Sequence, residues 1–210
     1  MLYLMPVLLA YLIGSVSGSL LLGRLRNVDI RTQGSGNAGG TNAFRTQGLI
    51  FALGVIFIDI GKGALAVAIP SLMNIYPTEP MLVAACGFAA IIGHCYPLWH
   101  KFRGGKGAGT FIGVMLMLAP VYILPALLVW LTVLFISGYV GLATIIAVCA
   151  LIPLVLIDSS SDYALKLLVF SAAVLIIFTH RENIRKLRSG TENRFERARF
   201  ENWFKRPSDG

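Results

Sequence analysis

The chain has 210 residues, of which 56% are hydrophobic and 13% charged, and its mean hydropathy is +0.75. Soluble globular domains carry about 45–50% apolar and about 25% charged residues, so the composition excludes a soluble, fibrous or disordered chain. It predicts an integral membrane protein. The formal net charge is +8, and a basic surface must therefore lie where lipid tolerates charge.

The apolar stretches predict membrane spans, because a spanning helix needs roughly 20 apolar residues. Taken in chain order, such stretches cover about residues 2–22, 49–74, 81–99 and 163–179, with a longer apolar tract at 107–157. This tract contains no Asp, Glu, Lys, Arg or His.

The basic residues between the spans predict their orientation, because cytoplasmic loops carry an excess of Lys and Arg. The loop at 23–48 contains four Arg against one Asp, the segment 100–106 contains three basic residues, and the chain after residue 180 is strongly basic. The linkers 75–80 and 158–162 contain acids and no base. We therefore expect the N-terminus outside and the C-terminus in the cytoplasm.

This orientation requires the tract 107–157 to cross an odd number of times. A single helix of 51 residues would be about 75 Å long, which far exceeds the ~30 Å hydrocarbon core. Interruptions near Ala119–Pro120 and Ser137–Gly138 favour three crossings. The expected fold is an all-α membrane protein with seven transmembrane helices, and the alternative is five spans with a re-entrant or kinked pair.

We expect residues 1–194 to form one membrane domain and residues 195–210 to form a basic, aromatic cytoplasmic tail on the membrane surface. Small residues recur within the expected spans and favour close helix packing over ligand binding. They are Gly14, Ser15, Ser17, Gly18, Ser19, Gly107, Gly109 and Gly113.

Two loops have the composition of anion-binding sites. The first, at 34–45, combines glycines, small polar residues and a closing Arg45, which can clamp a phosphate. The second, at 93–107, runs from His94 to a glycine-rich turn with Lys106 before the next expected helix. The alternatives are a flexible linker for the first loop, and a structural His with membrane-anchoring basic residues for the second.

Two further groups of polar residues are candidates for a role in the site. Asp59 and Lys62 lie on one face of an expected span, where they form either a structural ion pair or part of a site. Residues 180–192 predict an interfacial amphipathic helix. Within it, Asn183 is the uncharged polar residue nearest the membrane.

The segments GSGNAGGTNAFR, GHCYPLWHKFRGGKG and HRENIRKLRSGTE resemble the three motif regions of the PlsY-type acyl-phosphate:glycerol-3-phosphate acyltransferases, and the resemblance runs over nearly the whole chain. It implies a multi-pass enzyme of the bacterial inner (cytoplasmic) membrane, with its active site facing the cytoplasm. Such an enzyme moves a fatty acyl group from acyl phosphate to the 1-hydroxyl of glycerol 3-phosphate in phospholipid synthesis. The products are lysophosphatidic acid and inorganic phosphate, and no metal or cofactor is needed.

The resemblance also implies the site residues. The catalytic set is Ser35, Asn37, His94 and Asn183. The substrate-binding set, to which we add the neighbouring Lys62 and Arg103, is Thr41, Asn42, Arg45, Lys62, Arg103, Gly104, Gly105 and Lys106.

Our hypothesis for the reaction is direct attack by the glycerol hydroxyl. A substrate phosphate or His94 accepts the proton, and Asn183 orients the imidazole. The less favoured alternative to direct attack is a covalent intermediate, in which Ser35 first takes the acyl group.

The main alternative function is a membrane transporter for a phosphorylated small solute. In transporters the polar substrate-binding groups lie near the bilayer midplane, whereas the site expected here lies at the cytoplasmic boundary. The expected partners are acyl phosphate, glycerol 3-phosphate and membrane lipid, with no nucleic acid. The sequence gives neither acyl-chain preference nor oligomeric state.

Overall fold

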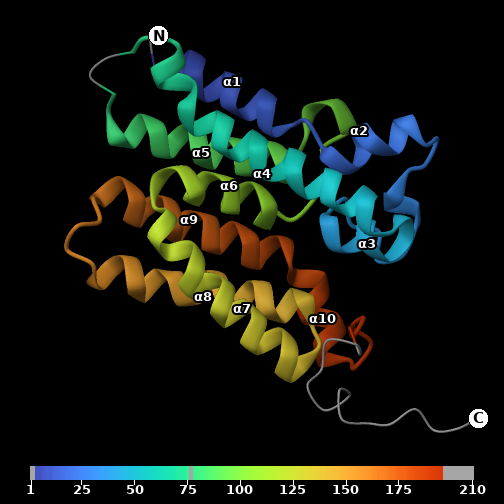
Figure 1. Cartoon of the computed structure of the whole chain (residues 1–210). Helices are drawn as coiled ribbons and strands as arrows, with labels where there is room; N and C mark the ends of the chain where they lie inside the picture. The colour runs from blue at the N-terminus through green and yellow to red at the C-terminus, as the bar shows by residue number, and fades with distance from the viewer. Residues whose placement is uncertain (1–2, 76–77, 196–210) are drawn as a thin grey trace, which may run out of the picture.

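The described part of the chain is helical. The structure, a computed structural model, describes residues 3–75 and 78–195 (Figure 1). Three short 3-10 helices, Ile30–Thr32, Leu98–His100 and Pro120–Tyr122, lie between the α-helices. In chain order the α-helices are α1 Leu4–Gly14, α2 Gly18–Leu25, α3 Gly40–Gln47, α4 Leu49–Leu72, α5 Pro80–Cys95, α6 Ala108–Leu118, α7 Ile123–Ser137, α8 Val140–Ile157, α9 Tyr163–Thr179 and α10 Arg181–Arg188.

Several of these helices are long and apolar enough to cross a membrane. Within the described residues, α4, α5 with the following 3-10 turn, α7 with the preceding one, and α8 meet this criterion. Two bent pairs meet it if each counts as one span: α1 with α2, bent by 46°, and α9 with α10, bent by 52°. The protein is thus an all-helical integral membrane protein with four to six candidate spans.

The expected first span at residues 2–22 is interrupted in the structure. The chain leaves α1 after Gly14 and begins α2 at Gly18. At this break, the carbonyl of Val16 accepts a hydrogen bond from Lys62 Nζ at 2.7 Å, and the N–H of Gly18 donates to Asp59 Oδ1 at 3.3 Å. Side chains of α4 therefore satisfy backbone groups at the point where the helix is interrupted.

The two interruptions expected in the apolar tract are confirmed as helix boundaries. Helix α6 ends before Pro120, and α7 ends at Gly138, which has a φ of 76° in the left-handed region that favours glycine. At 11 residues, α6 is only about 16 Å long, short of the ~30 Å hydrocarbon core. The number of crossings in this tract therefore stays a prediction, whereas the expected helix at 163–179 coincides with α9.

The small residues bring helices into close contact, as expected. A Cβ atom added at Gly14 would overlap the backbone of Ala90 in α5, and one added at Gly113 would overlap the carbonyl oxygen of Ile60 in α4. A Cβ at Gly63 would overlap the carbonyl oxygen of Thr110, so α4 and α6 approach each other through glycines of both helices.

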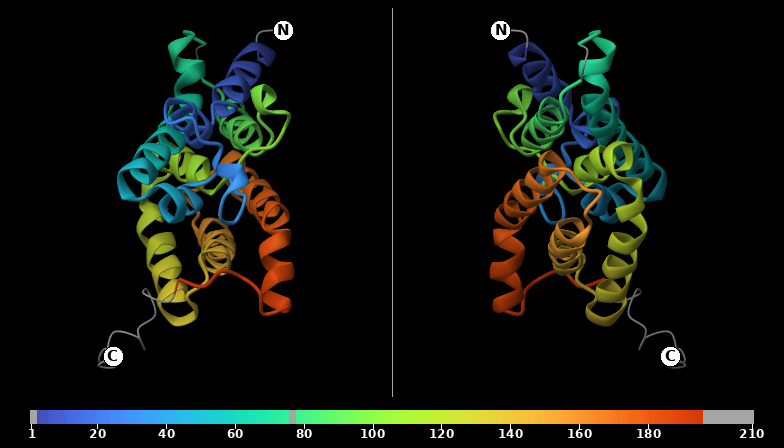
Figure 2. Two further views of the ribbon diagram at one scale, coloured as in Figure 1. Left: turned by 90° about the vertical axis from the view of Figure 1, so that its right-hand side faces the viewer. Right: turned by 90° about the vertical axis from the view of Figure 1, so that its left-hand side faces the viewer.

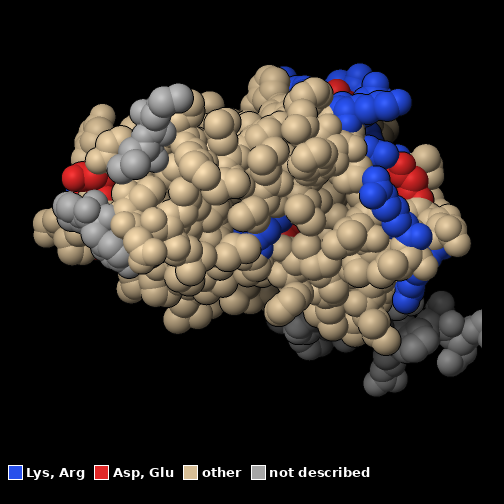
Figure 3. All heavy atoms as spheres, turned by 90° about the horizontal axis from the view of Figure 1, so that it is seen from above, with Lys and Arg blue, Asp and Glu red and all other residues tan. Residues whose placement is uncertain are grey.

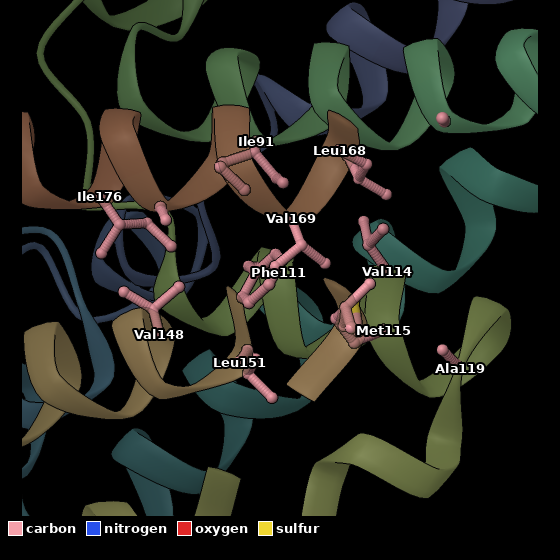
Figure 4. Close-up of a cluster of buried hydrophobic side chains, with 14 of the residues drawn as sticks. Ile91, Phe111, Val114, Met115, Ala119, Val148, Leu151, Leu168, Val169 and Ile176 are labelled. Carbon is pink, nitrogen blue, oxygen red and sulfur yellow. The ribbon is translucent and has the colours of Figure 1, made fainter. Parts of the chain in front are cut away.

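The helices form two groups joined by a shared core. In Figures 1 and 2, α1, α2, α4 and α5 lie on one side of the molecule and α7, α8 and α9 on the other, with α6 near their junction. Figure 4 shows the core at this junction. Its buried side chains include Ile91 of α5, Phe111 and Met115 of α6, Val148 of α8 and Val169 of α9.

Charge is gathered at one end of the molecule. In Figure 3 most Lys and Arg side chains on the visible face lie at the end where α2, α3 and α10 are found in Figure 1. The middle of this face is almost entirely uncharged. Large apolar side chains such as Phe57, Ile136 and Phe170 are exposed, which suits contact with lipid.

Candidate active site

A buried polar cluster of Asp59, Lys62 and His94 lies between the middle of α4 and the last turn of α5, and each of these residues is no more than 5% exposed. Lys62 Nζ lies 2.8 Å from Asp59 Oδ1, 2.8 Å from His94 Nδ1 and 2.7 Å from the carbonyl oxygen of Val16. A lysine ammonium has three N–H donors, so all of them are used. We therefore interpret Lys62 as a residue that orients His94, and not as the direct substrate ligand that the sequence led us to expect.

Lys62 and Asp59 both face one nitrogen of the imidazole. His94 Nδ1 lies 2.8 Å from Lys62 Nζ and 3.5 Å from Asp59 Oδ1, and donation from the Lys62 ammonium to Nδ1 favours the tautomer with the ring proton on Nε2. Nε2 lies against Gly105, because a Cβ added at Gly105 would overlap it. The side chain of His94 is thus covered by the glycine turn that precedes Lys106.

The Gly104–Gly105 turn has a different role from the anion cradle that we expected. The N–H of Gly104 donates to the carbonyl of Cys95 at 3.1 Å, and the N–H of Gly105 donates to the carbonyl of His94 at 3.1 Å. These two donors are already used within the protein. The turn instead fastens the loop to the end of α5, and a residue larger than glycine would not fit there.

The first loop is organised around Asn42, which is 1% exposed. Its Oδ1 accepts from the N–H of Ser35 at 2.9 Å, and its Nδ2 lies 3.0 Å from the carbonyl oxygens of Ile30, Gln33 and Asn37. Asn42 therefore braces the loop from inside, which leaves no polar atom for a substrate. Within the described residues, the side-chain oxygen of Ser35 makes no hydrogen bond.

Two serines connect this loop to the buried cluster. Ser19 Oγ donates to the carbonyl of Ala38 at 3.0 Å and lies 3.2 Å from Ser17 Oγ. Both belong to the segment whose Gly18 N–H reaches Asp59. The hydroxyls in this small-residue segment thus have a specific role that the packing interpretation did not include.

Lys106 and Asn183 meet near the charged end of the molecule. Lys106 Nζ donates to Asn183 Oδ1, and Asn183 Nδ2 donates to Glu192 Oε1 at 2.6 Å. The backbone carbonyl of Lys106 accepts from Thr179 Oγ1 at 3.0 Å. Asn183 is therefore paired with Lys106, and the expected pairing with the His94 imidazole is not found.

Burial lowers the pKa of Lys106 from its usual value. Glu192 acts against this shift, whereas the positive charges of Lys186 and Arg45 add to it. Arg45 Nη2 donates to the carbonyl of Asn193 at 3.5 Å, next to Glu192, so the end of the first loop lies beside the third motif. Three segments far apart in the sequence thus contribute charge to one group of side chains, the cationic cluster, which we define as Arg45, Lys106, Asn183 and Lys186.

The remaining expected residues lie at the surface. The side chains of Thr41 and Arg103 are exposed, and the backbone carbonyl of Arg103 accepts from Arg31 Nη1 at 3.2 Å. Arg31 also pairs with Asp29 at 2.7 Å and lowers the pKa of that carboxyl. This arrangement links the first loop to the second.

Sequence reasoning omitted Asp59 and Glu192 from the site set. Asp59 was visible as an intramembrane acid three residues from Lys62, its expected partner, but its contact with the N–H of Gly18 was not. Glu192 belongs to the third quoted motif, where an acid among many bases was the available signal. Among the described residues, no group of three or more His, Cys, Asp and Glu side chains is arranged to hold a metal ion.

An apolar cavity of about 380 Å³ lies between α6, α7 and α8. Each of these helices lines it with residues at positions i, i+3, i+4 and i+7, from Ala108 to Met115, from Ile123 to Trp130 and from Thr144 to Leu151. Ile112 and Leu127 also line it and are 40% and 46% exposed. The apolar cavity therefore begins two residues beyond Lys106 and borders the outer surface between α6 and α7.

The fold and the site together define an integral membrane protein with a cationic cluster beside an apolar cavity. A family model described as "Glycerol-3-phosphate acyltransferase" matches residues 4–190. The chain belongs to this family.

Two curated relatives and two solved structures show the extent of the similarity. Glycerol-3-phosphate acyltransferase of Geotalea daltonii is 42% identical over 90% of this chain and 95% of its own length, and that of Geobacillus kaustophilus is 42% identical over 89% and 92%. A crystal structure of PlsY, an integral membrane glycerol 3-phosphate acyltransferase, in its glycerol 3-phosphate form is 33% identical with a TM-score of 0.84, covering 97% of this chain and 99% of that one. The lysophosphatidic acid form has a TM-score of 0.81 at 33% identity, covering 91% and 94%.

Proposed function

We propose that the protein transfers a fatty acyl group from acyl phosphate to the 1-hydroxyl of glycerol 3-phosphate, giving lysophosphatidic acid and inorganic phosphate. Membership of the glycerol-3-phosphate acyltransferase family supports the acceptor and the product. The observation that carries the proposal is that the apolar cavity begins at Ala108, two residues after Lys106 of the cationic cluster. The cluster suits a phosphate and the cavity suits an acyl chain.

The reaction needs little covalent help from the protein, because acyl phosphate is already activated. The glycerol hydroxyl oxygen forms a bond to the acyl carbon, and the bond from that carbon to the phosphate oxygen breaks. Arg45 and Lys106 hold phosphate groups by charge-assisted hydrogen bonds. Ser35 and Asn37 orient the attacking hydroxyl or stabilise the developing oxyanion, and Asn183 positions Lys106.

The proton from the hydroxyl goes to a substrate phosphate. His94 is less suited as the base because its Nδ1 contacts Lys62 Nζ at 2.8 Å and its Nε2 is covered by Gly105. We assign His94 to hold the Gly104–Gly105 turn, and through it the loop that carries Lys106. Trapping an acyl group on Ser35 during turnover would contradict direct transfer.

The activity test uses purified protein in lipid vesicles with acyl phosphate and glycerol 3-phosphate, and measures lysophosphatidic acid and phosphate release. Replacing Lys106→Gln should lower kcat/KM for glycerol 3-phosphate at least about tenfold, because a charge-assisted hydrogen bond to phosphate is lost. Lys101→Gln is the matched control, since it removes an exposed charge from the same loop. Absence of product with well-folded native protein would refute the function.

The proposed setting is the bacterial inner membrane, with seven crossings and the site facing the cytoplasm. Four long apolar helices, two bent pairs and the short apolar α6 are consistent with seven apolar segments. The gathering of Lys and Arg at the end that holds the cationic cluster supports the orientation (Figure 3).

A further inference from the structure

The apolar cavity ends at a residue that also lines a second cavity. This second cavity, of about 520 Å³, lies where the linker after Thr78 meets the end of α6 and the linker between α8 and α9. Tyr122 is a lining residue of both cavities. Its side chain therefore separates the apolar cavity from the second, more polar one.

The hydroxyl of Tyr122 is held on the side of the second cavity. It donates to Asp158 Oδ2 at 2.5 Å and lies 2.8 Å from Ser161 Oγ. The other carboxylate oxygen of Asp158 accepts from the N–H and the hydroxyl of Ser160, at 2.8 and 2.7 Å. The Tyr122 hydroxyl and both carboxylate oxygens of Asp158 thus have hydrogen-bond partners. Because only 7% of Tyr122 is exposed as well, the ring is held in one position.

The apolar cavity has a defined length. Each of its three helices contributes two turns, which is about 10 Å along the helix axis. At one end lies Ala108, two residues after Lys106 of the cationic cluster. At the other end lie Met115, Ile123 and Leu151 together with Tyr122, so a chain that enters beside Lys106 and follows the cavity meets the tyrosine ring.

We propose that Tyr122 sets the maximum acyl-chain length by closing the far end of the apolar cavity. The inference rests on the proposed acyl transfer and adds a specificity-determining residue that lies far from the reacting atoms. An acyl chain that ends before the ring is fully buried. A longer chain must displace the ring, which costs two hydrogen bonds, or leave the cavity sideways into lipid.

The test is a competition among octanoyl, lauroyl and palmitoyl phosphate for the same enzyme with glycerol 3-phosphate, so that one chain fits the cavity and two exceed it. Mass spectrometry gives the ratio of the lysophosphatidic acid products. Tyr122→Ala should raise the ratio of the palmitoyl to the octanoyl product at least about tenfold, since each methylene that an apolar pocket admits gives discrimination of this size. Tyr122→Leu should raise it less, and Tyr122→Phe should keep the native ratio because it keeps the ring.

Val121→Ala is the matched control, because Val121 lines only the second cavity. Product ratios within one sample do not depend on the folded fraction, so a partly unstable variant remains informative. If Tyr122→Ala does not fold, the product ratio of Tyr122→Leu tests the proposal. An unchanged ratio, or an equal shift in Val121→Ala, overturns the role of Tyr122, whereas absence of any product from the native protein refutes the proposed acyl transfer instead.

Discussion

Lys62 contacts three segments of the chain through one ammonium group. Its type and position suggested a substrate ligand or an ion pair, but no local pattern indicated that it would contact both the preceding and the following segment. The motifs drew attention to Lys106, Arg45 and Asn183, which the structure brings to one end of the molecule. Their partners were not predicted, because hydrogen bonding between Asn183 and Lys106 depends on tertiary packing across 77 positions.

The buried pair of Asp59 and Lys62 yields a stability prediction. Lys62→Met should lower the free energy of unfolding by about 3–5 kcal/mol, because it leaves the Asp59 carboxylate buried without its main partner. The double variant Asp59→Asn with Lys62→Met should recover part of this loss. Thermal unfolding in detergent measures both, and a double variant no more stable than Lys62→Met would argue against the pairing.

The environment of Lys106 yields a pH prediction. Its pKa is lowered by burial, so it loses its positive charge at lower pH than an exposed lysine, for which the pKa is about 10.4. We expect kcat/KM for glycerol 3-phosphate to fall as pH rises through this lowered pKa. Lys106→Arg keeps its charge throughout and should lack the alkaline fall, whatever its activity at neutral pH. An identical alkaline fall in both proteins would assign the titration to another group.

At the scale of helices, hydrophobic pattern and breaker residues predicted most boundaries. The match at α9 and the breaks at Pro120 and Gly138 follow from local composition. The break between α1 and α2 does not follow from local composition, because Lys62 and Asp59 of α4 form hydrogen bonds with the backbone of Val16 and Gly18 at this point. Local sequence carries no signal for such a tertiary interaction.

The approach of α4 and α6 yields a paired prediction on one helix. Gly63→Ala should lower stability by about 1–3 kcal/mol, since its Cβ would overlap the carbonyl oxygen of Thr110. Gly61→Ala, two residues earlier, meets no atom within 4 Å and should be neutral or stabilising by up to about 1 kcal/mol. Equal melting temperatures for the two variants would contradict the close approach.

At the scale of the molecule, the sequence predicted that Lys and Arg gather on one side. The prediction to test is the side of the membrane on which each loop lies. Single cysteines replacing Ser160 and Gln47 should react with a membrane-impermeant maleimide from opposite sides of the inner membrane. Ser160 should label in intact spheroplasts, and Gln47 only after the membrane is opened. Labelling of both from one side would rule out an odd number of crossings between α3 and the linker after α8.

The buried contacts of Lys62 also have a consequence for biogenesis. Its acceptors lie on the segment before α4, on α4 itself and on α5. When only the segment before α4 and α4 itself have entered the membrane, the Lys62 ammonium group still lacks its contact with His94 of α5. The polar centre is completed only when α5 arrives, which makes the N-terminal half of the chain a single unit of co-translational assembly.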